Sequence, residues 1–177
     1  MTPGFLRHLL SIALLPFVVT VVVPWWLIAR NRFVPPWPDG SALQMAGRIG
    51  GALVLLAGLS LFTWCVLLFA RVGQGTLAPW DPTRRLVAVG PYRYMRNPMI
   101  TGVATILAGE ALLTGSRSIA LWLALFVVVN HVYFLTVEEP GLARRFGAEY
   151  EAYRRHVPRW IPRLKAWPGD HRSTRKS

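Results

Sequence analysis

The sequence predicts an all-α protein, namely an integral membrane bundle of about four transmembrane helices followed by a C-terminal amphipathic helix on the cytoplasmic side. Of its 177 residues, 53% are hydrophobic and 16% are charged, whereas soluble domains average about 25% charged residues. Long apolar stretches recur along the chain, and basic residues gather between and after them. We interpret residues 1–177 as a single membrane domain.

Four apolar segments are candidate spans, because about 20 mostly apolar residues cross the hydrocarbon core of a bilayer. The first two contain no Asp, Glu or Lys, the third is short and contains Glu110, and the fourth is interrupted by Asn130 and His131. The third could therefore be re-entrant instead of crossing fully. The segments are residues 9–29, 49–70, 99–113 and 119–137.

The first segment has one feature of a signal peptide, since Arg7 precedes its apolar run. However, the run is longer than a signal core, and no small-x-small cleavage site follows it. It ends in Trp25-Trp26 and then Arg30, which are typical anchors at a membrane interface. We therefore expect it to be retained as the first span.

The second span holds the only cysteine, Cys65, and a set of glycines. A single cysteine permits neither an intramolecular disulfide nor a cysteine-type zinc site, so we expect no metal. Small residues allow helices to approach closely in lipid, which predicts ordinary helix packing at Gly47, Gly50, Gly51 and Gly58.

The charge distribution predicts the topology. The net charge is +12, and of 20 Lys and Arg residues five lie within Arg71–Arg96 and ten follow Glu138. Positive loops face the cytoplasm, so both regions are expected there, in a bacterial inner membrane, although Arg30, Arg32 and Arg48 then fall outside. Basic residues beside spans attract anionic lipid headgroups, so we expect membrane lipids as partners and no nucleic acid.

The last two spans are predicted to form an antiparallel hairpin. The turn at residues 114–118 is just long enough to reverse the chain. The hairpin therefore brings residues 97–102 close to residues 137–139. The preceding loop, residues 71–97, is long but rich in apolar and aromatic residues, which favours an ordered and functional loop.

An amphipathic helix is expected in the cytoplasmic segment 138–165, because apolar residues recur there with helical spacing. Val157-Pro158 ends it, since the residue before proline disfavours helix. Such a helix can lie on the membrane or cover a cavity. The polar tail, residues 166–177, is predicted to be disordered. The apolar stripe is Leu142, Phe146, Tyr150, Tyr153 and Val157.

Three polar residues at the end of the fourth span could carry chemistry. Glu138 and Glu139 lie where the chain leaves the lipid, and His131 precedes Glu138 by two turns on one α-helical face. A structural alternative exists for each: His131 as a helix–helix hydrogen-bonding residue, and the glutamates as solvated acids paired with arginines.

The loop before the third span supplies complementary groups. Tyr92 and Tyr94 offer aromatic faces, and Arg93 and Arg96 offer cations. Together with the glutamates, this inventory suits a cofactor that has an aromatic base, a ribose and a charged amino-acid end. Composition alone does not name that cofactor.

Two blocks of the chain resemble a known family. Gly90-Pro-Tyr-x3-Arg-Asn-Pro-x3-Gly102, and Glu138-Glu139-x2-Leu-x3-Phe-Gly-x2-Tyr-x2-Tyr-x3-Val-Pro-Arg159, are similar to motifs of the isoprenylcysteine carboxyl methyltransferase and phospholipid methyltransferase superfamily. The resemblance covers about residues 86–162. It implies an integral membrane enzyme that uses S-adenosylmethionine.

The resemblance also implies which residues enclose the cofactor. Asn97 and Ile100 stand where the superfamily has histidine and tyrosine, and Gly102 is half of a Gly-x-Gly motif. Glu138 matches the cofactor-binding glutamate and, with His131, is the candidate catalytic base for an acceptor that must lose a proton. The full cofactor-binding set is Leu86, Val87, Tyr92, Arg96, Asn97, Pro98, Ile100, Gly102, Glu138 and Glu139.

The acceptor is expected to be lipophilic or amphiphilic, with a carboxylate or an amine as the methylated group. Prenylcysteine methyltransferases carry an arginine four residues before the glutamate pair, where this chain has Phe134, so a prenylcysteine carboxylate is disfavoured. Two alternatives stay open: a membrane reductase of related architecture that uses NADPH on a sterol-like or isoprenoid substrate, and a non-catalytic protein that retains the fold.

Overall fold

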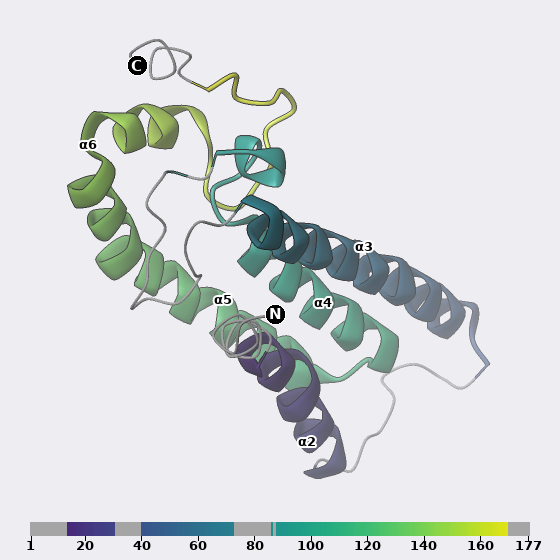
Figure 1. The fold of residues 1–177 in the computed structure, drawn as a ribbon. Coiled ribbons are helices and arrows are strands. Elements are labelled where there is room, and N and C mark those ends of the chain that lie inside the picture. The colour runs from purple at the N-terminus through teal and green to yellow at the C-terminus, as the bar shows by residue number, and fades with distance from the viewer. Residues whose placement is uncertain (1–13, 31–39, 73–85, 87, 170–177) are drawn as a thin grey trace.

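The computed structural model describes residues 14–30, 40–72, 86 and 88–169, and every regular element within them is helical (Figure 1). This confirms the all-α prediction. The short elements η1 and η3 are π-helical, and η2 is a 3₁₀ turn. In chain order the elements are η1 (Val18–Val22), α2 (Val23–Arg30), α3 (Ala42–Val72), η2 (Gly90–Arg93), α4 (Pro98–Thr114), α5 (Arg117–Tyr133), η3 (Phe134–Glu138) and α6 (Glu139–His156).

Two helices are long and apolar enough to cross a membrane, Ala42–Leu68 and Arg117–His156. Two further apolar helices, Leu14–Arg30 and Pro98–Thr114, are shorter. These four helices coincide with the predicted spans, apart from residues 9–13, which lie outside the described residues. Large apolar side chains on α3 and α5 face outward, as lipid-facing residues do, among them Leu53, Leu56, Leu121 and Val128. The number of full crossings remains a prediction.

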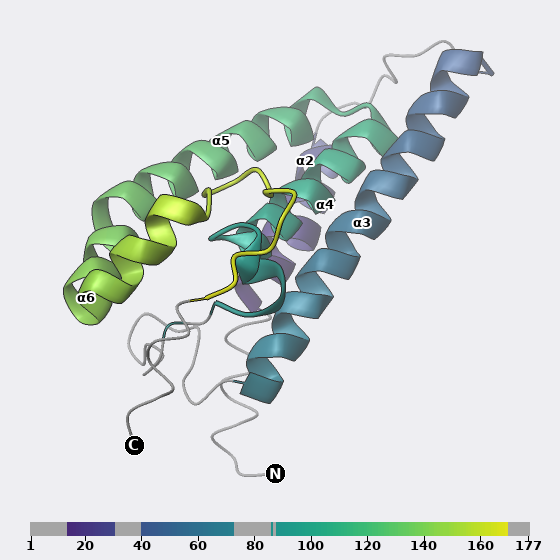
Figure 2. The same cartoon turned by 90° about the horizontal axis from the view of Figure 1, so that it is seen from above.

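Helices α3 and α4 lie side by side and antiparallel in both views (Figures 1 and 2). Glycines on both helices bring the two backbones into contact. A Cβ atom at Gly109 would lie 2.5 Å from the backbone nitrogen of Leu55, and one at Gly58 would lie 2.7 Å from that of Ile106. The predicted close packing is thus confirmed for Gly58, and Gly51 makes a similar approach, whereas nothing lies within 4 Å of a Cβ at Gly50.

The turn between α4 and α5 forms the expected hairpin. Gly115 ends α4 in the left-handed region at φ 66°, which glycine adopts without steric cost. The Ser116 hydroxyl then accepts a hydrogen bond from the Ile119 backbone N–H and caps α5. At the first helix, the Trp122 indole donates to the carbonyl of Val19 over 3.0 Å, which fastens η1 to α5.

Helix α5 continues through η3 into α6 without a loop, and the chain then bends at Gly147. Gly147 has φ 51° and ψ −127°, which is not helical, so α6 consists of two helical parts instead of the one uninterrupted helix expected. The helix ends at His156, before Val157-Pro158, as predicted. All five residues of the apolar stripe belong to one hydrophobic cluster together with Trp167.

Residues 157–169 return from α6 and cross the turn at η2 (Figure 2). The sequence predicted that Trp167 lies in a disordered tail, but its side chain is buried and packs on Tyr153 within the hydrophobic cluster. Residues 170–177 lie outside the described residues.

The glycine contact between α3 and α4 can be tested by Gly109→Ala. The added methyl group would collide with backbone atoms of α3, which cannot rotate away, so we expect a loss of about 1–3 kcal/mol. Thermal unfolding of the detergent-purified protein measures the change. Gly50→Ala is the matched control and should be neutral or stabilising by up to about 1 kcal/mol. Equal melting temperatures for the two variants would contradict the packing described.

Candidate active site

The two glutamates lie at the junction of η3 and α6, directly after Val137, where the predicted fourth span ends. A π-helical turn accommodates about one residue more than an α-helical turn, and so rotates the following residues by roughly 100°. Glu139, and not Glu138, therefore follows His131 on the same face. This corrects the prediction that His131 and Glu138 share a face, which assumed an uninterrupted α-helix.

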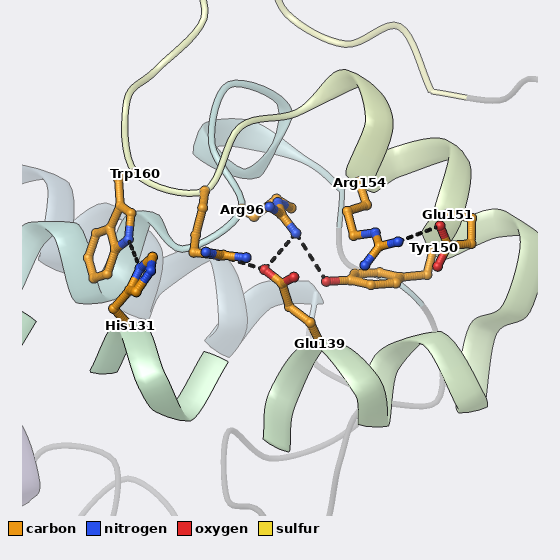
Figure 3. Close-up of polar contacts among 8 residues, drawn as sticks. Arg96, His131, Glu139, Tyr150, Glu151, Arg154 and Trp160 are labelled. Atoms are coloured by element: carbon orange, nitrogen blue, oxygen red, sulfur yellow. Dashed lines mark hydrogen bonds and ion pairs between the residues drawn. The ribbon is translucent and has the colours of Figure 1, made fainter. Parts of the chain in front are cut away.

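Glu139 is the centre of a buried ion-pair cluster (Figure 3). Its Oε1 atom accepts hydrogen bonds from Nη1 of Arg96 and from Nε of Arg159, both at 2.7 Å. Arg96 also donates to the hydroxyl of Tyr150 over 3.4 Å. The side chains of Arg96, Glu139 and Arg159 are only 11%, 8% and 16% exposed. One carboxylate thus joins the loop before α4, the helix junction and the segment after α6.

The environment keeps Glu139 ionised. Burial by itself would raise the pKa of the carboxyl, but the hydrogen bond from Arg159 and the charges of Arg96 and Arg159 outweigh burial and lower the pKa below 4.5. The alternative of solvated acids paired with arginines is thus confirmed for Glu139 in its pairing and wrong in its solvation, because this carboxylate is buried. The contact with Arg96 also confirms that the hairpin brings the loop and the glutamates together.

Glu138 has a different environment. It is half-buried, and burial together with the adjacent charge of Glu139 raises its pKa to about 7, while Arg96 opposes the rise. The pKa of the Tyr92 hydroxyl is also raised. Burial is the main cause, and the charge of Glu138 contributes to the rise. The junction therefore holds one carboxyl whose pKa is lowered and one whose pKa is raised to about 7.

His131 is held by the C-terminal segment. The indole N–H of Trp160 donates to Nδ1 of His131 over 3.1 Å, and the two rings stack with centroids 6.4 Å apart. Because an indole nitrogen can only donate, Nδ1 carries the lone pair and the ring proton lies on Nε2. In this arrangement His131 has no free lone pair with which to accept a proton.

The loop residues lie against the same junction. The main-chain carbonyl of Tyr92 accepts a hydrogen bond from the Tyr153 hydroxyl at 2.7 Å. Arg93 donates from Nε to the carbonyl of Trp167 over 2.6 Å. The structure thus brings together Tyr92, Arg96, Glu138 and Glu139 of the predicted cofactor-binding set.

The other predicted residues lie elsewhere on the same elements. Asn97 precedes the first turn of α4, Pro98 is buried there, and Ile100 follows half-buried. Gly102 is packed against the backbone of Phe62 in α3, so its lack of a side chain already has a structural explanation. Leu86 covers the hydrophobic cluster around Tyr150, and Val87 lies outside the described residues.

Three residues that contact the site were not predicted from the sequence as site residues: Tyr150, Arg159 and Trp160. Tyr150 was assigned to an apolar stripe, although its hydroxyl receives a hydrogen bond from Arg96. Arg159 closes the second motif block, and that position after Val-Pro was the available signal. Among the described residues, no group of three or more His, Cys, Asp or Glu side chains could hold a metal ion.

Comparison with known proteins identifies the family. The family model of phospholipid methyltransferases matches residues 46–149, more than half of the chain. The protein belongs to the phospholipid methyltransferase family. This confirms the resemblance to the isoprenylcysteine and phospholipid methyltransferase superfamily. The match begins in α3, before the two motif blocks, and ends before Arg159 and Trp160.

Two curated relatives are similar to parts of the chain. The cobalt-zinc-cadmium resistance protein CzcN of Cupriavidus metallidurans is 27% identical over 153 residues, which are 86% of this chain and 64% of the relative. Methanethiol S-methyltransferase 2 of Bradyrhizobium diazoefficiens is 33% identical over 78 residues, which are 42% of this chain and 28% of the relative. The chain thus spans less than two thirds of the length of either. No solved structure matches it.

The family and the long apolar helices together identify a membrane protein of a methyltransferase family. The matched region contains the loop residues Tyr92 and Arg96 and both glutamates. The ion-pair cluster therefore joins the matched part of the chain to the unmatched C-terminal segment.

The ion-pair cluster can be tested by Glu139→Gln. Loss of the carboxylate leaves two buried guanidinium groups uncompensated, which should destabilise the protein by on the order of 3 kcal/mol at neutral pH. Because the native pKa lies below 4.5, the stabilisation is present in full above that pH and is lost as the pH falls through the native pKa. Thermal unfolding of wild type and variant across a pH series measures both effects.

Glu151→Gln is the control, because its ion pair with Arg154 is solvent-exposed and should contribute less than about 1 kcal/mol. If Glu139→Gln and Glu151→Gln had the same melting temperature at neutral pH, the cluster would not have the stabilising role described.

Proposed function

We propose that this protein is a membrane methyltransferase that transfers the methyl group of S-adenosylmethionine to a lipophilic or amphiphilic acceptor. The observation that carries the proposal is the position of Glu138 directly before the buried ion pair of Glu139 with Arg96, in a chain of a methyltransferase family. The proposed acceptor group is a carboxylate or an amine of a lipid-like molecule. One of the similar proteins, methanethiol S-methyltransferase 2, is named as a methyltransferase, which supports the proposed reaction type.

The residues at the junction fit this cofactor. The Nε atom of Arg96 is buried and has no hydrogen-bond partner among the described residues, so one of its donors is available to an anionic group such as a carboxylate. Within the part of the chain that the structure describes, Glu138 forms no ion pair, and its half-buried carboxylate suits ribose hydroxyls. Tyr92 of η2, whose carbonyl is bonded to Tyr153 of α6, supplies an aromatic ring on the loop. These are the three kinds of group that the cofactor requires.

Bound S-adenosylmethionine would supply an electrophilic methyl group, and methyl transfer needs position more than covalent help from the protein. The task of this chain is then to hold and orient both reactants. A carboxylate acceptor needs no base. An amine acceptor must lose a proton, and Glu138 suits that role because its pKa of about 7 lets it accept a proton near neutral pH. His131 is the weaker candidate, since Trp160 occupies its Nδ1 lone pair.

We further propose that the protein crosses the inner membrane of a bacterium several times, with the glutamate junction and the C-terminal segment in the cytoplasm. The concentration of basic residues in these regions supports this orientation. It would place the site where the water-soluble cofactor is available, and a lipophilic acceptor could enter from the bilayer. Purified membranes incubated with methyl-labelled S-adenosylmethionine, followed by identification of the labelled product, would name the acceptor.

The cofactor assignment can be tested by Glu138→Gln. Loss of the carboxylate should weaken S-adenosylmethionine binding tenfold or more, about 1.4 kcal/mol, as measured by calorimetry on the detergent-purified protein. Glu149→Gln, an exposed glutamate in α6, is the control and should bind as wild type. NADPH should not bind. Unchanged affinity in Glu138→Gln would refute the assignment, and binding of NADPH alone would favour a reductase.

The pH dependence of binding gives a second test. Below about pH 7 Glu138 is largely protonated, and the ionised form is the better partner for a cationic cofactor. Affinity for S-adenosylmethionine should therefore rise as the pH increases through about 7 and then level off. The rise should disappear in Glu138→Gln. A wild-type affinity that is constant from pH 6 to 8 would contradict this role of Glu138.

A further inference from the structure

The segment Pro158–Trp167, here called the strap, is fastened along the loop before α4 (Figure 2). Backbone hydrogen bonds hold it at its beginning, middle and end, so it does not depend on side-chain contacts to follow the loop. The bonds run from Arg96 N–H to Pro158 carbonyl at 2.9 Å, from Arg163 N–H to Tyr94 carbonyl at 3.0 Å, and from Trp167 N–H to Arg93 carbonyl at 2.9 Å.

Two consecutive strap residues reach across to the helix on the other side. Arg159 bonds to Glu139 at 2.7 Å, and Trp160 bonds to His131 at 3.1 Å (Figure 3). The two helix residues are separated by on the order of 10 Å along the axis. Attachment at two separated points fixes the rotation of the helix as well as its position, and the turn between those points ends in Glu138.

Phe134 strengthens the second attachment. It is buried and packs against the Trp160 ring with centroids 5.6 Å apart, next to the hydrogen bond with His131. Phe134 occupies the position where prenylcysteine methyltransferases carry an arginine, and in this chain its side chain packs against the strap. His131 likewise uses its acceptor nitrogen for the strap. Both residues are engaged in joining the strap to the helix.

We propose that Arg159 and Trp160 are positioning residues of the candidate active site: through Glu139 and His131 they orient the helix turn that carries Glu138 toward the loop. This inference rests on the proposed function. Neither residue lies within the part of the chain that matches the family, which ends at residue 149. The strap lies beyond the region that the family model matches, and it joins the loop and the helix from one side.

A positioning role has an electrostatic signature, because Arg159 is one of the cations that balance the glutamates. Without it, the local potential becomes more negative, and the pKa values of both carboxyls should rise. The pH at which cofactor binding is half-maximal should then move upward. Among the described residues, four titratable or charged groups interact with the pair: Tyr92 of η2, Arg96 of the loop, Tyr150 of α6 and Arg159 of the strap.

The test uses the full-length, detergent-purified protein and S-adenosylmethionine as the probe. Arg159→Ala should weaken binding about tenfold and shift its pH midpoint upward, whereas Arg159→Lys should retain most of the affinity and the midpoint. Trp160→Phe keeps an aromatic ring but removes the indole N–H donor, and should weaken binding several-fold. If Arg159 acts through Glu139, adding Arg159→Ala to Glu139→Gln should cause little further loss.

Two matched controls isolate the effect. Arg154→Ala removes a cation of an exposed ion pair in α6, and Trp25→Phe removes an exposed indole in α2. Both should bind as wild type. Amide hydrogen exchange without ligand provides a readout that does not depend on the cofactor. Exchange should accelerate in Arg159→Ala, but not in Arg154→Ala, at the three amides whose N–H groups bond the strap to the loop, those of Arg96, Arg163 and Trp167.

Unchanged affinity and an unchanged pH midpoint in Arg159→Ala would overturn the inference. So would a weakening of binding in Arg154→Ala that is as large as in Arg159→Ala, because the effect would then not be specific to the strap. Failure of the proposed function looks different. The wild-type protein would then not bind S-adenosylmethionine at all, while the exchange data would still decide whether Arg159 fastens the strap to the helix.

Discussion

The carboxylate of Glu139 holds together three segments that are far apart in the sequence. It receives hydrogen bonds from Arg96 in the loop before α4 and from Arg159 in the strap, and it lies itself at the start of α6. Water is largely excluded from all three side chains, so none of these charges can be left without its partners. The relative placement of loop, helix and strap is therefore coupled to this one group.

The membrane helices determine whether that group can form. Glycines at the contact of α3 and α4 allow their backbones to touch, which fixes α4 and the loop that leads into it. The tight turn through Gly115 and Ser116 then returns the chain as α5. As a result, the start of α4 and the end of α5 meet at one end of the bundle, and Arg96 reaches Glu139.

Adjacent carboxyl groups acquire different properties at this junction. Two arginines pair with Glu139 and lower its pKa, which favours the ionised form. The negative charge of Glu139 is one reason why the pKa of Glu138 rises to about 7. Separation of the pKa values of paired acids is a common way to give them separate roles. In the proposed enzyme, Glu139 maintains the architecture and Glu138 faces the ligands. The strap contributes to both, because it supplies Arg159 and holds the preceding helix turn through Trp160.

The sequence by itself determined the helical class, the four apolar segments, the hairpin and the family, because hydrophobic length, turn residues and motif spacing are local properties. It also predicted that the loop and the glutamates would meet. Only the tertiary structure decided which glutamate faces the arginines, since a π-helical turn rotates the chain and leaves no reliable pattern in the residues. The break of α6 at Gly147 and the path of the strap along the loop were likewise decided only by the tertiary structure. Arg159, Trp160 and Trp167 find their partners through long-range contacts, and no local spacing in the sequence specifies them.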